Sequence, residues 1–120
     1  IVSENVRKEL LLFLEEKKKQ NKIVVGYGAA AKGNTLLNYC GVTKDLIKFV
    51  CDAAESKQNK FLPGSHIEIK KPNNLYEKKI DYILILPWNI KDEIIKEHNS
   101  LSKKGVIFFT AINGIKFLKN

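Results

Sequence analysis

The sequence has 120 residues and a formal net charge of +8, with 44% hydrophobic and 28% charged residues. This length fits one domain, and the composition excludes a chain that is disordered throughout. The positive charge comes almost entirely from lysines that are spread along the chain. This distribution predicts a solvated basic surface and no nucleic-acid partner. The apolar runs are too short to cross a membrane.

An amphipathic helix is predicted over residues 3–20. Ser3 is a favourable N-cap, because its hydroxyl can accept a hydrogen bond from a free N–H of the first turn. Apolar side chains recur at helical spacing and form one stripe: Val6, Leu10, Phe13 and Leu14. Lysines gather at the C-terminal end of this segment, where the helix dipole favours cations.

Strands and helices alternate in the rest of the chain. Continuous apolar runs predict buried strands at residues 22–28, 46–51, 81–86 and 105–110. Helical patterns fall at residues 29–40, 74–79 and 90–99. Weaker signals predict a loop over residues 53–66, a short strand over 66–69 and an edge strand within 111–120.

Cap residues set the limits of two helices. Gly41 is predicted to end the helix over residues 29–40. Asn89 is predicted to cap the helix over residues 90–99, with Asp92 three residues later as a capping-box partner. His98, near the end of that helix, is expected on the surface, where the dipole favours it.

This order of elements predicts an α/β fold. Strands that are apolar along their whole length are typical of parallel sheets covered on both faces. We therefore expect a Rossmann-like, open and mostly parallel sheet with helices on both faces, plus the N-terminal amphipathic helix, in one domain over residues 1–120. The chain starts at Ile1 and has no methionine, so we expect it to be a piece of a longer protein.

The cysteine pattern predicts a reducing compartment. Cys40 and Cys51 lie far apart and have no metal-ligand spacing. Cys51 falls in an apolar strand, so we expect a buried and reduced thiol. No secretory signal pattern opens the sequence, and we therefore expect a cytoplasmic protein.

A glycine-rich turn joins the first strand to the second helix. Gly26, Tyr27, Gly28 and Ala29 open the pattern G-x-G-x-x-A, which ends at Ala31. In dinucleotide-binding proteins the first glycine makes the turn, the second lets the backbone approach a phosphate, and the small third residue lets the helix pack closely. The helix N-terminus then attracts the anion. The same glycines also suit a tight turn without a ligand, and both interpretations stay open.

Polar residues after the turn are candidate phosphate contacts. Lys32 falls in the first helical turn, where the dipole disfavours a cation unless an anionic ligand is bound. Asn34 and Thr35 are further candidate donors. Each of the three would also be an ordinary solvated residue.

Four other candidate contacts lie near the ends of later elements. Asp52 ends the second strand, where an acidic residue often holds a ribose hydroxyl, and it would also suit a turn. His66 follows the turn at Pro63–Gly64 and is a candidate ligand contact; the alternative is an exposed loop histidine without a ligand. Trp88 and Asn89 follow the third strong strand, where open parallel sheets bind ligands. Core packing and helix capping are the alternatives for these two.

No residue is predicted to be catalytic. The sequence has no recognisable set of nucleophile, histidine and acid, no metal-ligand box and no Walker lysine. We therefore expect neither a metal nor a cofactor to bind to this domain.

Three motifs together resemble the C-terminal domain of the SAM-dependent sugar C-methyltransferases, which act on nucleotide-linked deoxysugars. They are GYGAAAKGNTLLN at residues 26–38, FLPGSHI at 61–67 and LILPWN at 84–89. The resemblance implies a longer protein with an N-terminal zinc-binding module, a central SAM-binding methyltransferase domain and this C-terminal domain. Catalysis would then belong to the central domain, which would be a partner of this one.

By this resemblance, the domain helps to enclose the nucleotide-sugar. Its ligand-facing parts would be residues 26–35, 63–66 and 87–89, and the diphosphate would meet the helix N-terminus and Lys32. Direct SAM binding by this chain is not expected, because the strand before the glycine turn lacks the acidic residue that methyltransferase glycine loops usually follow.

Two other functions remain open. Asp52 is compatible with an NAD-type dinucleotide-binding module, although no catalytic partner accompanies it. A ligand-free Rossmann-like domain that serves only assembly would instead show an exposed apolar patch around Trp88 and no nucleotide binding.

Overall fold

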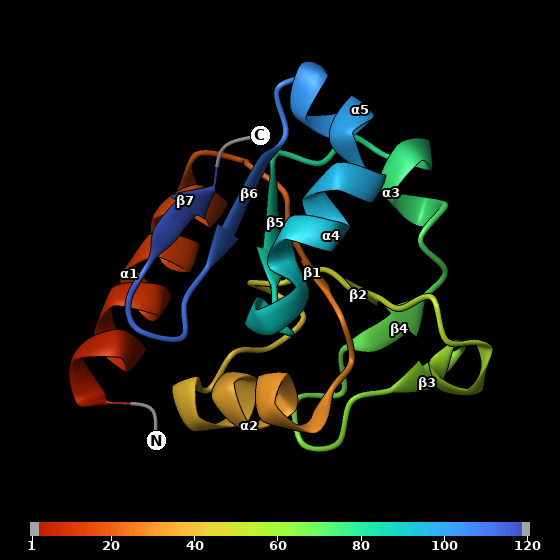
Figure 1. Ribbon diagram of the computed structural model, residues 1–120. Coiled ribbons are helices and arrows are strands. Elements are labelled where there is room, and N and C mark those ends of the chain that lie inside the picture. The colour runs from red at the N-terminus through yellow and green to blue at the C-terminus, as the bar shows by residue number, and fades with distance from the viewer. Residues whose placement is uncertain (1–2, 119–120) are drawn as a thin grey trace.

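The computed structural model describes residues 3–118, in which seven strands form one sheet flanked by helices (Figure 1). The strand order is β3-β4-β2-β1-β5-β6-β7. The bounds are β1 Val24–Tyr27, β2 Val50–Cys51, β3 Lys60–Phe61, β4 Glu68–Lys70, β5 Tyr82–Ile85, β6 Ile107–Thr110 and β7 Lys116–Leu118. The inner pairs from β4 to β6 are parallel, and the edge strands β3 and β7 pair antiparallel.

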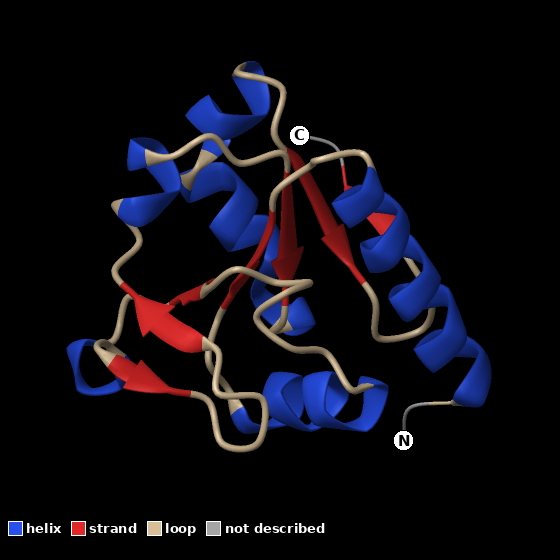
Figure 2. Cartoon of the chain, turned by 180° about the vertical axis from the view of Figure 1, so that it is seen from behind, coloured by secondary structure: helices blue, strands red, loops and turns tan. Residues whose placement is uncertain are grey.

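Helices cover both faces of the sheet, as predicted. The α-helices are α1 Glu4–Lys19, α2 Ala31–Cys40, α3 Asn74–Glu77, α4 Lys91–Glu97 and α5 Asn99–Lys103, and the 3₁₀ turns are η1 Glu55–Lys57 and η2 Trp88–Ile90. Seen from behind, α1 lies in front of the sheet and α4 lies beyond it (Figure 2). The mostly parallel α/β sheet predicted from the sequence is therefore confirmed.

Successive residues of the strands pack into two separate hydrophobic cores, one on each face of the sheet. Val24 of β1 packs with the buried residues of α1 and α2, such as Leu14 and Leu37. The next residue, Val25, packs with the buried residues of α4, such as Ile94. Because both faces are covered, the inner strands need apolar side chains at every position, which explains their continuous apolar sequence.

The helix ends predicted for α1 and α2 are largely confirmed. The N–H of Val6 donates to Ser3 Oγ at 3.2 Å, so Ser3 is the N-cap of α1. Gly41 ends α2 in the left-handed conformation, with φ of 70°. The start of α2 differs from the prediction, because Ala30 is extended and the helix begins at Ala31 rather than at residue 29.

The segment between β1 and β5 contains more structure than predicted. Residues 46–51 contribute only Val50–Cys51 to the sheet, because the N–H groups of Leu46 and Ile47 donate to the Thr43 carbonyl in a turn. The predicted loop over residues 53–66 contains η1 and β3, and β3 pairs with β4. The predicted strand over 66–69 is shifted to β4, because His66 has φ of 59° and leaves the extended region. The helix predicted over 74–79 ends at Glu77.

The prediction for residues 89–99 is wrong in its details. Asn89 lies inside the 3₁₀ turn η2, in which the N–H of Ile90 donates to the Pro87 carbonyl, and it does not cap α4. The first turn of α4 has no side-chain cap, so Asp92 makes no capping box. The helical segment also breaks at His98, after which α5 begins.

The C-terminal part follows the prediction closely. β6 comes from the predicted strand over residues 105–110, and β7 is the predicted edge strand, although residues 119–120 of that tail lie outside the described residues. Cys40 and Cys51 are buried free thiols, as expected. No helix within residues 3–118 is both long enough and apolar enough to cross a membrane.

Candidate functional site

The connections after β1 and β5 leave the sheet toward opposite faces. α2 follows β1 and packs on one face, whereas α4 follows β5 and packs on the other. β1 and β5 are parallel neighbours, with Tyr27 opposite Ile85 at their carboxyl ends. Open α/β sheets bind ligands beyond the strands at such a point, because the two connections diverge and leave a crevice.

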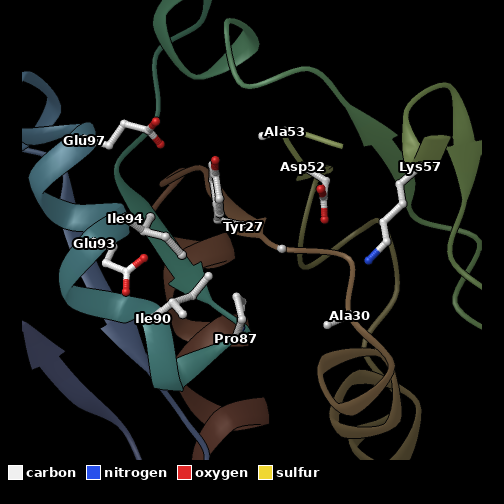
Figure 3. Close-up of a pocket in the computed structure, with 11 residues that line it drawn as sticks. Tyr27, Ala30, Asp52, Ala53, Lys57, Pro87, Ile90, Glu93, Ile94 and Glu97 are labelled. Carbon is white, nitrogen blue, oxygen red and sulfur yellow. The ribbon is translucent and has the colours of Figure 1, made fainter. Parts of the chain in front are cut away.

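A cavity of about 430 Å³ opens at this point, between α4 and the loops after β1 and β2 (Figure 3). We call it the α4 cavity. Its volume lies in the range of small-molecule sites. It is lined by Tyr27, Gly28, Ala30, Asp52, Ala53, Lys57, Pro87, Ile90, Glu93, Ile94 and Glu97.

Asp52 organises the glycine-rich turn beside the cavity. Its Oδ2 accepts the N–H of Ala29 at 2.7 Å, and its Oδ1 accepts the N–H of Ala54 at 2.8 Å. The N–H of Gly28 donates to the Cys51 carbonyl at 2.7 Å. Two N–H groups of the turn are therefore hydrogen-bonded within the chain.

Close packing accounts for two glycines of this region. Gly28 has φ of 96°, and a Cβ there would lie 2.3 Å from Cδ of Pro87. A Cβ on Gly33 would lie 2.6 Å from Cβ of Leu86, so this glycine lets α2 approach the end of β5. Because both contacts are internal, these glycines are required whether or not a ligand is present.

Lys57 places a cation in the cavity. Its Nζ donates to the Ala29 carbonyl at 3.3 Å. The ammonium group points toward Ala30, at the start of α2 (Figure 3). Lys57 and the positive end of the α2 dipole therefore make this side of the cavity favourable for an anion.

The opposite wall carries two carboxylates. Glu93 and Glu97 are four residues apart on α4, so they share one helix face. Figure 3 shows both side chains directed from α4 toward the space around Tyr27. The cavity therefore has a cationic side at Lys57 and an acidic side at α4.

Tyr27 lies between these two sides. Tyr27 is only 6% exposed, and its hydroxyl has no hydrogen bond to another residue in the described part of the chain. Burial, with smaller contributions from the charges of Glu97 and Asp52, raises the pKa of Tyr27 to about 12. The phenol is therefore protonated at neutral pH and can donate a hydrogen bond.

His98 is buried behind this wall, which corrects its predicted place on the surface. The Tyr76 hydroxyl and Nδ1 of His98 are 2.5 Å apart. Nε2 lies 3.3 Å from Oε2 of Glu97 but makes no hydrogen bond within residues 3–118. Burial lowers the pKa of His98, and the Glu97 carboxylate opposes that shift only in part. His98 is on the core side because it belongs to the break between two helices that both pack on the sheet.

The structure brings together only part of the predicted site. Tyr27, Gly28 and Asp52 line the α4 cavity. Gly26 lies within β1, and the N–H of Ala29 donates to Asp52, but neither residue lines the cavity. The other candidates do not line it: Lys32, Asn34, Thr35, His66, Trp88 and Asn89.

These other candidates are exposed, except for the half-buried Asn34. Lys32 and Thr35 are exposed on α2, and Oδ1 of Asn34 is buried without a hydrogen bond to any described residue. His66 is exposed on a loop, and Asn89 is exposed in the 3₁₀ turn η2. Trp88 is 43% exposed and lines a second cavity, between η2 and the segment that joins β6 to β7.

Sequence reasoning missed three charged residues of the cavity. Glu93 and Glu97 follow the third strong strand at helical spacing, and this pattern would have placed both on one helix face beside the strand ends. Lys57 gave no such signal, because it lies in an irregular segment that the tertiary fold brings back to α2. In residues 3–118, no three His, Cys, Asp or Glu side chains are arranged to hold a metal ion.

Comparisons with known proteins find a matching family and a related protein. Residues 2–113 match the family model described as the C-methyltransferase C-terminal domain. The C-methyltransferase NovU of Streptomyces niveus is 37% identical over 109 residues, which make up 91% of this chain and 26% of NovU. The chain therefore spans about a quarter of the length of this curated relative.

A solved structure has a similar fold. The UDP-D-quinovosamine 4-dehydrogenase of Vibrio fischeri superposes with a TM-score of 0.58 at 23% sequence identity. The match covers 82% of this chain and 93% of that chain. This similarity confirms the Rossmann-like fold and, at such low identity, supports the fold alone.

Proposed function

The chain belongs to the C-methyltransferase C-terminal domain family, and we propose that it binds the nucleotide-sugar substrate of such an enzyme in the α4 cavity. Methyl transfer would take place in a methyltransferase domain of the same protein, which would be the partner of this one. We assign SAM and zinc to those other parts. The two buried free cysteines fit our proposal of a cytoplasmic protein.

The observation that carries this proposal is the position and lining of the α4 cavity. It lies where Rossmann-like sheets bind nucleotides, and its Lys57 side offers a cation next to the start of α2. We place the diphosphate on this side, because an anion gains there from both the ammonium group and the helix dipole. The domain would thereby orient the sugar for the methyltransferase domain.

The predicted contacts outside the cavity remain proposals. Lys32, Asn34 and Thr35 lie in the first turns of α2, within the same segment as the glycine turn. We propose that Lys32 assists Lys57 at the outer edge of the diphosphate. His66 lies in the loop before β4, whereas Trp88 and Asn89 both lie in η2. We propose that these residues contact the ligand or the partner domain when the two domains meet.

We propose that this chain does not bind SAM. The strand that precedes the glycine turn contains no acidic residue. The N–H of Ala29 is already taken by Asp52. We therefore propose that the methyl donor is held elsewhere.

The NAD-type alternative has less support. Both oxygens of Asp52 accept backbone N–H groups, and the N–H groups of Gly28 and Ala29 are used within the chain. A dinucleotide site of this fold directs such groups at the ribose and the pyrophosphate. The assembly-only alternative would leave the cavity without a ligand.

A titration of the 120-residue chain with UDP-glucose, dTDP-glucose, NAD and SAM tests the proposal. We expect saturable NMR shifts with a nucleotide-sugar. Lys57→Ala should weaken its binding about tenfold, the cost of about one charge-assisted hydrogen bond. Lys60→Ala removes the same charge from the exposed strand β3, outside the cavity, and should leave binding unchanged.

Each other outcome rejects the proposal. Equal losses in the two variants would show that Lys57 acts only through net charge. Binding of NAD in place of nucleotide-sugars would favour the dinucleotide module. Absence of binding to all four compounds would favour an assembly domain.

A further inference from the structure

We infer that a second cavity at the carboxyl edge of the sheet binds an aromatic anion, meaning a planar aromatic ring that carries a phosphate or carboxylate group. We call it the Trp88 cavity; it lies between η2, the start of α4 and the segment that joins β6 to β7. This site does not depend on the proposed function, because it is another cavity with another class of ligand. Trp88 would then contact this second ligand instead of the nucleotide-sugar.

The position of the Trp88 cavity is typical of a ligand site. β5 and β6 are parallel neighbours, and the cavity is lined by Trp88, which follows β5, and by Ile112, which follows β6. Open parallel sheets bind ligands beyond the carboxyl ends of their strands. The volume of about 430 Å³ equals that of the α4 cavity. Ile90 lines the α4 cavity, so residues 88–91 lie between the two cavities.

The two cavities differ in charge. Among the described residues, one lysine and three carboxylate side chains line the α4 cavity, whereas Lys91 and Lys116 line the Trp88 cavity and no carboxylate side chain does. Neither of these two lysines has an ion pair or a side-chain hydrogen bond within residues 3–118. An anionic ligand group would therefore gain from both ammonium groups without displacing an internal partner.

Trp88 supplies the surface for the ring. The residue is 43% exposed, although tryptophan is usually largely buried. In the described part of the chain no other ring packs against its indole, and the half-buried side chains of Ile112 and Ile115 complete the apolar lining. A planar ring would bury this surface and would also gain from offset stacking on the indole.

Thr110 and Asn113 add hydrogen-bonding groups to the same lining. Thr110 ends β6 and is only 6% exposed, yet its hydroxyl has no hydrogen bond to any residue within 3–118. Asn113 is exposed, and its amide likewise has no partner among the described residues. Both groups can therefore bond to oxygen atoms of a ligand. An apolar lining with a few polar groups is the usual composition of a small-molecule site.

The wall formed by residues 111–115 is held in place from behind by α1. The N–H of Ile115 donates to Oε1 of Glu9, and a Cβ on Gly114 would lie 3.1 Å from the same oxygen. Figure 1 shows this segment turning beside α1. Glu9 does not line the cavity. Because the wall is fixed by the fold, a ligand would not have to order it on binding.

Trp88 is the single tryptophan of the sequence, so intrinsic fluorescence reports on this cavity. Phenyl phosphate would be titrated into the 120-residue chain and should quench the fluorescence saturably. Cyclohexyl phosphate carries the same charge without an aromatic ring, and benzyl alcohol carries the ring without the charge. From NMR titrations we expect phenyl phosphate to bind at least about threefold more tightly than the first and tenfold more tightly than the second.

Variants assign this binding to residues. Lys91→Gln and Lys116→Gln should each weaken phenyl phosphate about threefold to tenfold, and Trp88→Leu should remove its preference over cyclohexyl phosphate. Lys96→Gln makes the same charge change on α4 outside the cavity and should leave binding unchanged. NMR spectra of each variant verify the fold, and the two lysine variants give a result even if Trp88→Leu is unfolded.

Four results would each overturn the inference. A missing saturable response to phenyl phosphate would show that the cavity binds no aromatic anion. Equal binding of the two phosphates would show that the indole selects no ring. Equal losses in Lys91→Gln and Lys96→Gln would show that only net charge acts. An excess of UDP-glucose should leave phenyl phosphate binding unchanged, and competition would show that the Trp88 cavity belongs to the nucleotide-sugar site. The first three results leave the proposed function standing, because Lys57→Ala tests that separately.

Discussion

The Asp52 carboxylate, at the end of β2, accepts the N–H of Ala29 in the turn after β1, at 2.7 Å. The same carboxylate accepts the N–H of Ala54, so one side chain ties together two loops that border the α4 cavity. From the sequence alone, an acidic residue at this position is predicted to hold a ribose hydroxyl. In the folded chain it holds the glycine-rich turn and thereby sets where α2 begins.

Asp52→Ala should lower the free energy of unfolding by about 1–3 kcal/mol, because two partly buried N–H groups lose their acceptor. Urea unfolding measures this loss. Asp45→Ala removes an exposed carboxylate and should change stability by less than about 0.5 kcal/mol. Equal effects of the two substitutions would show that the Asp52 hydrogen bonds contribute little.

Two glycine substitutions separate backbone strain from steric overlap. Gly28 and Gly41 both have positive φ, at 96° and 70°, but only Gly28 lacks space for a Cβ, because Pro87 packs against it. Gly41→Ala should cost about 1 kcal/mol, from strain alone. Gly28→Ala should cost about 2–4 kcal/mol, since overlap adds to strain. A smaller cost for Gly28→Ala than for Gly41→Ala in urea unfolding would contradict this packing.

The buried His98 should make the protein less stable in mild acid. Its pKa is lowered by burial from the usual 6.5, so the unfolded chain takes up the proton first as the pH falls below that value. The free energy of unfolding should therefore fall as the pH drops through and below about 6.5, with a contribution of at most about 1.4 kcal/mol per pH unit.

His98→Gln should reduce this dependence on pH. The comparison is made in a His66→Gln background, which leaves His98 as the single histidine, since the sequence has two. Unfolding would be followed by circular dichroism at several pH values. Parallel pH profiles with and without His98 would show that its burial does not control stability.

Both thiols should be unreactive in the folded protein. Cys51 is 0% exposed and Cys40 is 1% exposed, and burial raises the pKa of both, to about 12 for Cys51. A thiol reagent such as DTNB at pH 8 should therefore label neither cysteine until urea unfolds the chain, after which both react. Rapid labelling under native conditions would indicate local opening of α2 or β2.

The difference between predicted and observed elements has a local cause in each case. Residues 46–51 look like one strand, but two N–H groups of this run donate to the Thr43 carbonyl, and only Val50–Cys51 reaches the sheet. Asn89 has the residue type of a helix cap, but the 3₁₀ turn that begins after Pro87 includes it. Both errors arise because competing hydrogen bonds of adjacent turns are not visible in residue types.

The candidate site was only partly accessible to sequence reasoning. Tyr27 and Gly28 were found from the glycine-rich pattern, and Asp52 was found because it ends the second strand; parallel strands bring their carboxyl ends to one edge. Lys57 was missed because an irregular segment carries it back to Ala29. Glu93 and Glu97 were missed because solvent-exposed acidic residues on a helix are common, and only the neighbouring wall makes them part of a cavity.

The sequence by itself determined the α/β class, the covered sheet, the glycine-rich turn and the family, because the periodicity of apolar residues and the spacing of glycines are local properties of the chain. The tertiary structure alone decided which charged groups meet in the α4 cavity, that His98 is buried, and that Asp52 serves the turn after β1. These features depend on contacts between segments that are far apart in the chain. Such contacts are set by how the helices pack on the two faces of the sheet.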